Sequence, residues 1–141
     1  IQLGKPINLI KQARELAKKT GCKLLYLSDF YGDLDIKHLR GLGPMEFVSY
    51  LANAEYVFTN SFHGTAFSVN LHKNFFAEVN TLSRYNYRAE ALLKACGLMK
   101  RTMEQCKDVF EESKKPIDFN AVENVLNLER NRSEKYFNEI L

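Results

Sequence analysis

The sequence predicts an α/β layered fold, because short apolar segments alternate with longer segments of helical periodicity. Three segments have the length and the β-branched or aromatic content of strands: Lys23–Leu27, Tyr56–Phe58 and Phe75–Val79. The connections between them are too long for hairpins, which implies parallel strands joined by helical crossovers. We therefore expect a small parallel sheet with flanking helices.

The first element is a helix that starts near Pro6, a residue suited to the first helical turn. Gly21 is expected to end it, because glycine adopts the left-handed conformation that closes helices at little steric cost. The stretch from Phe30 to Gly43 lacks a clear periodicity and is predicted to be a loop. The apolar face of the first helix consists of Ile7, Ile10, Ala13, Leu16 and Ala17.

Pro44 begins a second predicted helix, which ends near Ala54. Glu46 lies in its first turn, where a carboxylate interacts favourably with the helix dipole. A third helix is expected over residues 62–71, between the second and third strands.

Two further helices are expected in the C-terminal part. One spans residues 87–95 and is closed by Gly97, and the other spans residues 118–140 and closes the chain. Asp118 is placed to cap this closing helix, and Ile117 and Val122 are spaced to pack together at its start.

The composition favours one globular domain. Of the 141 residues 45% are hydrophobic and 26% are charged, and the net charge of +3 includes no basic run longer than two residues. Nucleic-acid binding is therefore not expected, whereas a small anionic ligand is compatible with this charge. No segment approaches the roughly 20 apolar residues of a membrane span, and no signal segment opens the chain, so we expect a cytoplasmic protein. The free cysteines Cys22, Cys96 and Cys106 are expected to be structural thiols in a reducing compartment.

The most distinctive segment runs from Thr59 through Ser61, His63, Gly64 and Thr65, where a predicted strand passes into a helix. In parallel α/β sheets, ligands bind outside the carboxyl ends of the strands. The N–H groups of the first helical turn, left accessible by Gly64, would form an anion seat to which Ser61 and Thr65 add hydroxyl groups. His63 is the side chain in this segment that exchanges a proton near neutral pH.

Structural interpretations of the same residues remain open. Ser61 could be only a helix cap, Gly64 could only permit close packing of the helix on the sheet, and His63 could be a hydrogen-bonded structural residue. His38 and His72 lack a second histidine or a carboxylate at metal-ligand spacing. We therefore expect both to be surface or packing residues, and we propose no metal site.

Arg84 and Arg88 follow the end of the third predicted strand, so they are expected at the same edge of the sheet as His63. An arginine there could bind a carboxylate or a phosphate through two parallel hydrogen bonds. For Arg88 we favour a solvated position at a helix start. Glu78 is expected to be a partner for a basic group or an edge-facing charge.

The region from Gly43 to Arg101 resembles the C-terminal half of the polysaccharide pyruvyl transferase family. The matching features are the helix start at Pro44–Phe47 and the Ser-Phe-His-Gly-Thr sequence at 61–65 after a strand. A short aromatic strand follows, and supporting matches are Ser83-Arg84, Leu92-Leu93, Gly97-Leu98 and Arg101.

This resemblance implies that residues 1–141 are one Rossmann-like half, the C-terminal domain, of a larger GT-B-like enzyme with a facing N-terminal domain. It implies transfer of the enolpyruvyl group of phosphoenolpyruvate to a sugar of a cell-surface polysaccharide or of its lipid-linked precursor, without a cofactor. His63 would be the acid or base, and Ser61, Gly64, Thr65 and Arg84 would hold the phosphate and the carboxylate. The isolated domain would be inactive, and the acceptor would bring the enzyme close to a membrane.

Two alternatives to this function remain open: a GT-B glycosyltransferase domain that uses a nucleotide sugar, and a noncatalytic binding module of the same fold. The distal apolar residues of the closing helix, Tyr136, Phe137 and Ile140, raise a separate question. We expect them to fold back on the domain, to pack against a second copy in a homodimer, or to be disordered.

Overall fold

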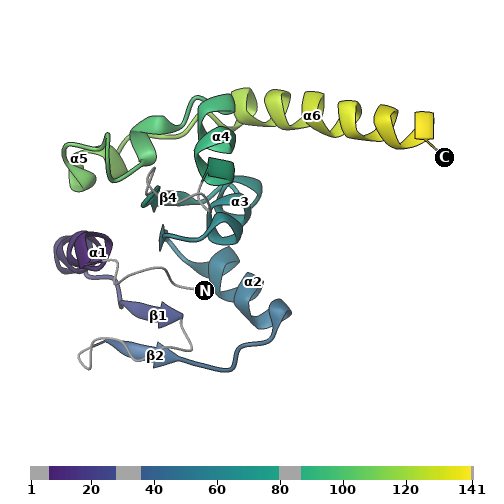
Figure 1. Cartoon of the computed structure of the whole chain (residues 1–141). Helices are drawn as coiled ribbons and strands as arrows, with labels where there is room; N and C mark the ends of the chain where they lie inside the picture. The colour runs from purple at the N-terminus through teal and green to yellow at the C-terminus, as the bar shows by residue number, and fades with distance from the viewer. Residues whose placement is uncertain (1–6, 28–35, 80–86, 141) are drawn as a thin grey trace.

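The computed structural model describes residues 7–27, 36–79 and 87–140, and this part of the chain has an α/β arrangement (Figure 1). Parallel strands with flanking helices, as the sequence predicts, are confirmed. The elements in order are α1 (Ile7–Thr20), β1 (Leu25–Leu27), β2 (Lys37–Leu39), α2 (Pro44–Asn53), β3 (Tyr56–Thr59), α3 (Phe62–Asn70), β4 (Asn74–Ala77), α4 (Tyr87–Ala95), the 3₁₀ helix η1 (Met99–Arg101), α5 (Val109–Ser113) and α6 (Phe119–Ile140).

The described strands form two small parallel sheets in place of the single sheet that the sequence predicts. β1 pairs with β2, and β3 pairs with β4 so that Thr59 lies opposite Ala77. A parallel bridge between Ala77 and Thr102 joins the segment after η1 to the β3–β4 sheet.

β2 lies within the stretch from Phe30 to Gly43, so the prediction of a loop is wrong at this point. The strand has three residues, too few to show a periodicity, and its pairing with β1 supplies the backbone hydrogen bonds that define it. Ile36, just before β2, is buried. Residues 30–35 lie outside the described part.

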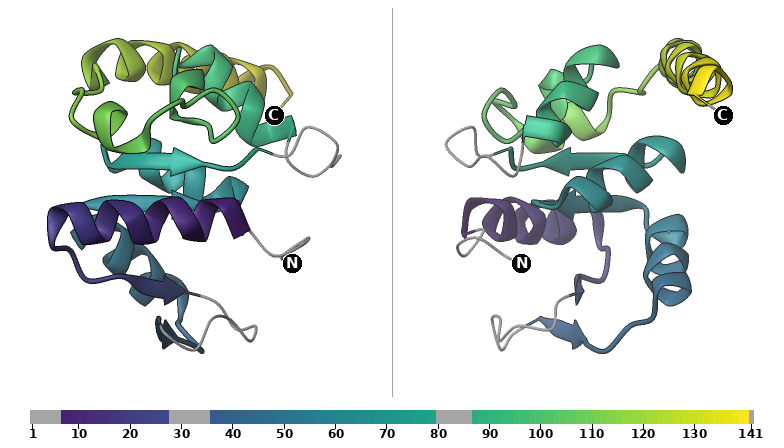
Figure 2. Two further views of the ribbon diagram at one scale, coloured as in Figure 1. Left: turned by 90° about the vertical axis from the view of Figure 1, so that its left-hand side faces the viewer. Right: turned by 45° about the vertical axis from the view of Figure 1, so that its right-hand side comes forward.

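Helices cover both faces of the β3–β4 sheet (Figure 2). Because side chains alternate along a strand, Phe75 packs on one face beneath α3, α4 and the start of α6, and Phe76 packs on the other face against α1 and α5. Phe76 also stacks on Phe58 of β3, with 5.4 Å between ring centroids. This double coverage is typical of parallel sheets.

Two predicted helix ends are confirmed by their hydrogen bonds. Gly97 has a φ of 68°, and the N–H of the following Leu98 donates to the carbonyl of Leu93 at 2.8 Å, which closes α4. The Oδ1 atom of Asp118 accepts from the N–H of Ala121 at 3.1 Å, which caps α6.

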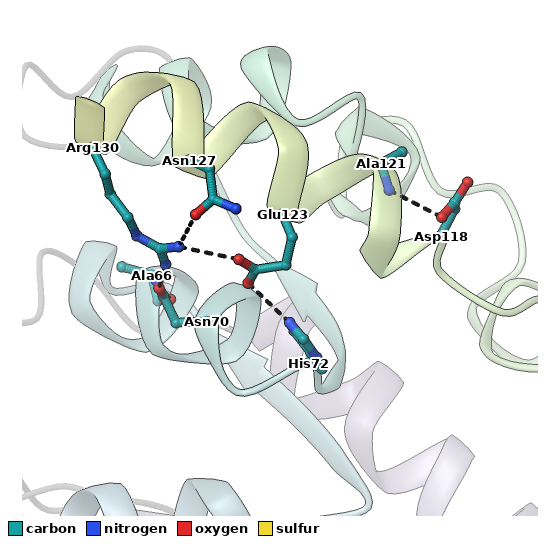
Figure 3. A network of polar contacts seen from close by, with 8 residues as sticks. All are labelled: Ala66, Asn70, His72, Asp118, Ala121, Glu123, Asn127 and Arg130. Atoms are coloured by element: carbon teal, nitrogen blue, oxygen red, sulfur yellow. Dashed lines mark hydrogen bonds and ion pairs between the residues drawn. The ribbon is translucent and has the colours of Figure 1, made fainter. Parts of the chain in front are cut away.

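A polar network attaches α6 to the end of α3 (Figure 3). Glu123 accepts from Arg130 at 3.1 Å and lies 3.0 Å from the Nε2 atom of His72. Arg130 also donates to Asn70 at 2.9 Å. The His72 ring stacks on Phe119 with 4.6 Å between centroids, so its predicted role as a surface or packing residue is confirmed.

Beyond this network, α6 extends past the other elements (Figure 1). All residues from 129 to 140 are exposed and helical, including Tyr136, Phe137 and Ile140. Of the three expected arrangements of these side chains, folding back on the domain is wrong, because all three side chains are exposed.

Candidate functional site

The segment from Thr59 to Thr65 lies at the carboxyl end of β3, as the sequence predicts. Thr59 is the last residue of β3 and Phe62 is the first residue of α3. The N–H of Glu78 donates to the carbonyl of Thr59 at 2.9 Å and continues the parallel ladder past Ala77. The ends of β3 and β4 therefore share one edge of the sheet, where α3 begins.

Ser61 is the N-cap residue of α3, with φ −107° and ψ 138°, but its side chain makes no capping hydrogen bond. Ser61 is an exposed residue at the N-terminus of α3. Helix geometry leaves the first-turn N–H groups without intrahelical partners, so this end of α3 keeps donors for a ligand.

Thr65 is only 1% exposed and has both of its donors engaged within the helix. Its N–H and its hydroxyl each donate to the carbonyl of Ser61 at 3.0 Å. The side chain therefore stabilises the turn that presents Ser61, and its contact with a substrate stays a prediction.

Gly64 permits α3 to pack directly on the end of β3. A Cβ at this position would lie 2.9 Å from the Cβ of Thr59 and closer still to the Oγ1 atom of Thr59. That Oγ1 atom accepts from the N–H of Ser61 at 3.1 Å. Close packing, one of the two interpretations of Gly64, is thus present, and contact between Gly64 and a ligand stays a prediction.

His63 is exposed in the first turn of α3. Its ring lies edge-on to the ring of Phe62, with 5.7 Å between centroids and 65° between planes. The imidazole therefore faces solvent beside an aromatic side chain and is not enclosed in the core.

Arg88, in the first turn of α4, is brought to the same place by tertiary packing. Its Cζ atom lies 4.5 Å from the centroid of the Phe62 ring, so Phe62 contacts both Arg88 and His63. Arg88 is exposed, as the sequence predicts, but it packs on a ring of the candidate site. In the sequence, the signal that pointed to Arg88 was its position after the third predicted strand, and Arg84 has the same signal. Arg84 lies outside the described residues.

Two other charged residues near the sheet have distinct environments. Burial raises the pKa of the Glu78 carboxyl, and the negative charge of Glu104 adds to this effect. Arg101 is buried, with Nη1 donating to Asn74 Oδ1 at 2.6 Å and Nη2 donating to the carbonyl of Lys115, and burial lowers its pKa. Glu78 is thus a half-buried charge near the sheet edge, and Arg101 is a structural residue.

Other features of the described residues lie elsewhere. A hollow of about 310 Å³ beside the end of α1 is lined by Arg14, Lys18, Cys22 and Ile36, among others, and by none of residues 59–65. His38 packs edge-on against Tyr26, as a packing residue does.

Within ranges 7–27, 36–79 and 87–140, no three His, Cys, Asp or Glu side chains are grouped to hold a metal ion. No helix in these ranges has the length and apolar character needed to cross a bilayer.

The chain matches the model of a known protein family. The family model for polysaccharide pyruvyl transferase matches residues 4–80, more than half of the chain. The match includes β3, α3 and the whole Ser61–Thr65 segment. Neither a curated protein nor a solved structure gives a significant match. The extent of the family match shows that this chain belongs to the polysaccharide pyruvyl transferase family.

Proposed function

We propose that this chain, within its full-length protein, transfers the enolpyruvyl group of phosphoenolpyruvate to a sugar of a cell-surface polysaccharide or its lipid-linked precursor. The product is a pyruvate ketal. The observation that carries this proposal is the exposed imidazole of His63 in the first turn of α3, at the carboxyl edge of the sheet and inside the family match.

The reaction requires proton transfer and binding of two anionic groups. A proton adds to the methylene carbon of phosphoenolpyruvate, and a sugar hydroxyl adds to the carbon that bears the phosphate and loses its own proton. The bond between this carbon and the bridging oxygen of the phosphate then breaks, and inorganic phosphate leaves. A second sugar hydroxyl adds to the same carbon and loses its proton. In total, one phosphoenolpyruvate and one sugar diol are converted into one ketal and one inorganic phosphate.

The residues of the segment from Thr59 to Thr65, together with Arg84, divide these tasks. His63 exchanges the proton, a role that typically contributes about 10²- to 10⁴-fold in rate. Ser61 and the first-turn N–H groups around Gly64 bind one oxyanion of the donor. Thr65 fixes the carbonyl of Ser61 and so the shape of this turn. Arg84 neutralises the phosphate or the carboxylate.

In the proposed enzyme this chain is the C-terminal, Rossmann-like half of a GT-B-like pair of domains. The facing N-terminal domain supplies further acceptor contacts. The reaction takes place in the cytoplasm, next to the membrane when the acceptor is lipid-linked. It uses no cofactor and no nucleic acid.

The test compares the His63→Gln and His72→Gln variants of the full-length protein. Glutamine keeps hydrogen bonding at position 63 but removes proton exchange near pH 7, so kcat should fall by about 100-fold or more while phosphoenolpyruvate affinity changes little. His72 is also exposed, and its replacement should leave kcat within about twofold. Full activity in His63→Gln would refute the acid–base role. Consumption of a nucleotide sugar in place of phosphoenolpyruvate would favour the glycosyltransferase alternative.

A further inference from the structure

The guanidinium group of Arg88 stacks on the aromatic ring next to His63. Its Cζ atom is 4.5 Å from the centroid of Phe62, whose ring lies edge-on to the imidazole. Ala89, the next residue in α4, is buried in the core cluster that also contains residues of β3, α3 and β4. The backbone of Arg88 is therefore held by core packing, and its side chain is directed across the start of α3.

Stacking leaves the hydrogen-bonding capacity of this arginine available. A guanidinium contacts a ring through its flat face, while its N–H donors point outward in the plane of the group. Among the residues that the structure describes, no carboxylate forms an ion pair with Arg88. Arg130 and Arg132, in contrast, form ion pairs with Glu123 and Glu129.

Another described arginine near this sheet, Arg101, uses both of its terminal nitrogens for hydrogen bonds within the fold. Arg101 is 3% exposed and donates to Asn74 and to the carbonyl of Lys115. It contacts Phe76, on the face of the sheet opposite to α3. Arg88 thus differs from Arg101 in being exposed, on the α3 side, and beside the proposed proton donor.

We propose that Arg88 binds an oxyanion of the donor, its phosphate or its carboxylate, and positions the donor against His63. This inference rests on the proposed function, since it takes phosphoenolpyruvate as the ligand of the site. Phe62 acts as the platform that holds the guanidinium in place. The assignment gives Arg88 a role in substrate binding where the sequence favours only a solvated arginine.

The experiment measures phosphoenolpyruvate binding to the full-length protein by titration calorimetry, with inorganic phosphate and pyruvate as separate probes. Arg88→Ala should raise the dissociation constant for phosphoenolpyruvate by about tenfold to a hundredfold, because a charge-assisted, two-point contact is lost. Arg88→Lys keeps the charge and loses the planar fork, so it should give an intermediate loss. Arg132→Ala, at an exposed arginine of α6, is the matched control and should bind as the wild type does.

The two probes identify the group that Arg88 binds. A selective loss of phosphate affinity assigns Arg88 to the phosphate, and a selective loss of pyruvate affinity assigns it to the carboxylate. Unchanged phosphoenolpyruvate affinity in both Arg88 variants, with a wild type that binds it, overturns the inference and leaves the proposed function standing. A wild type that does not bind phosphoenolpyruvate overturns both. Arg88→Lys also decides the matter if Arg88→Ala does not fold.

Discussion

Replacing Gly64 by alanine should destabilise the junction between β3 and α3. The added Cβ would lie 2.9 Å from the Cβ of Thr59 and nearer still to the Thr59 hydroxyl. This hydroxyl accepts a hydrogen bond from the N–H of Ser61 at 3.1 Å. Rotation of the Thr59 side chain can move the hydroxyl but not the Cβ atom, so the backbone of β3 or of α3 must shift. Overpacking of this kind costs about 1–3 kcal/mol.

Two smaller effects act in opposite directions at this position. Loss of the hydrogen bond between Thr59 and Ser61 adds about 1 kcal/mol to the cost. The higher helix propensity of alanine returns at most about 1 kcal/mol. The free energy of unfolding should therefore fall by about 2 kcal/mol, a loss within the usual range for a core defect.

Urea denaturation followed by circular dichroism measures this loss. Gly43→Ala is the matched control, because a Cβ there would meet only the flexible Glu46 carboxylate at 3.6 Å. Gly43 is the N-cap residue of α2, where alanine is less favourable than glycine, so the free energy of unfolding should fall by about 1 kcal/mol or less. In a Thr59→Ala background the cost of Gly64→Ala should fall by about half, since the hydroxyl and methyl groups of Thr59 are gone. A Gly64→Ala protein as stable as the wild type, or a cost that is the same in both backgrounds, would contradict the packing argument.

Three further predictions concern the rest of the domain. Arg101→Ala should lower the free energy of unfolding by about 3 kcal/mol in urea denaturation, because it leaves buried acceptors unpaired, whereas Arg132→Ala should change it by less than about 0.5 kcal/mol. Hydrogen bonds from His72 and Arg130 lower the pKa of Glu123 from its ordinary 4.5, so the attachment of α6 should be intact above pH 4.5 and weaken as the pH falls through the lowered pKa. Hydrogen exchange in α6 should show this acid weakening in the wild type, and Glu123→Gln should remove its pH dependence. Sedimentation of the 141-residue chain should show dimers that Phe137→Ser converts to monomers, and a monomer in both proteins would rule out self-association through α6.

Local sequence signals were sufficient to predict the helices that begin or end at a capping residue. The sequence predicts α4 with the bounds that the structure shows and α6 to within one residue. Gly97 marks the end of α4 through its backbone geometry, and Asp118 marks the start of α6 through its side-chain cap. β2 and the five-residue α5 could not be predicted in this way. Their existence depends on pairing with β1 and on packing against α1, which are tertiary contacts.

The position of the candidate site could be predicted from the sequence, but its tertiary contacts could not. Its place at a strand end could be predicted from the order of elements, because parallel strands end at one edge of the sheet. The contact between Gly64 and Thr59 could not, since it depends on how closely α3 approaches β3. The stacking of Arg88 on Phe62 joins residues 26 positions apart and arises only when α3 and α4 pack together.

Formation of a pyruvate ketal by the full-length protein tests the central proposal most directly. The protein is incubated with phosphoenolpyruvate and a panel of lipid-linked sugars, and released phosphate and modified acceptor are quantified together. The proposed function predicts one phosphate for each ketal formed with at least one acceptor. Phosphoenolpyruvate that stays intact with every acceptor, while a nucleotide sugar is consumed under the same conditions, would contradict it.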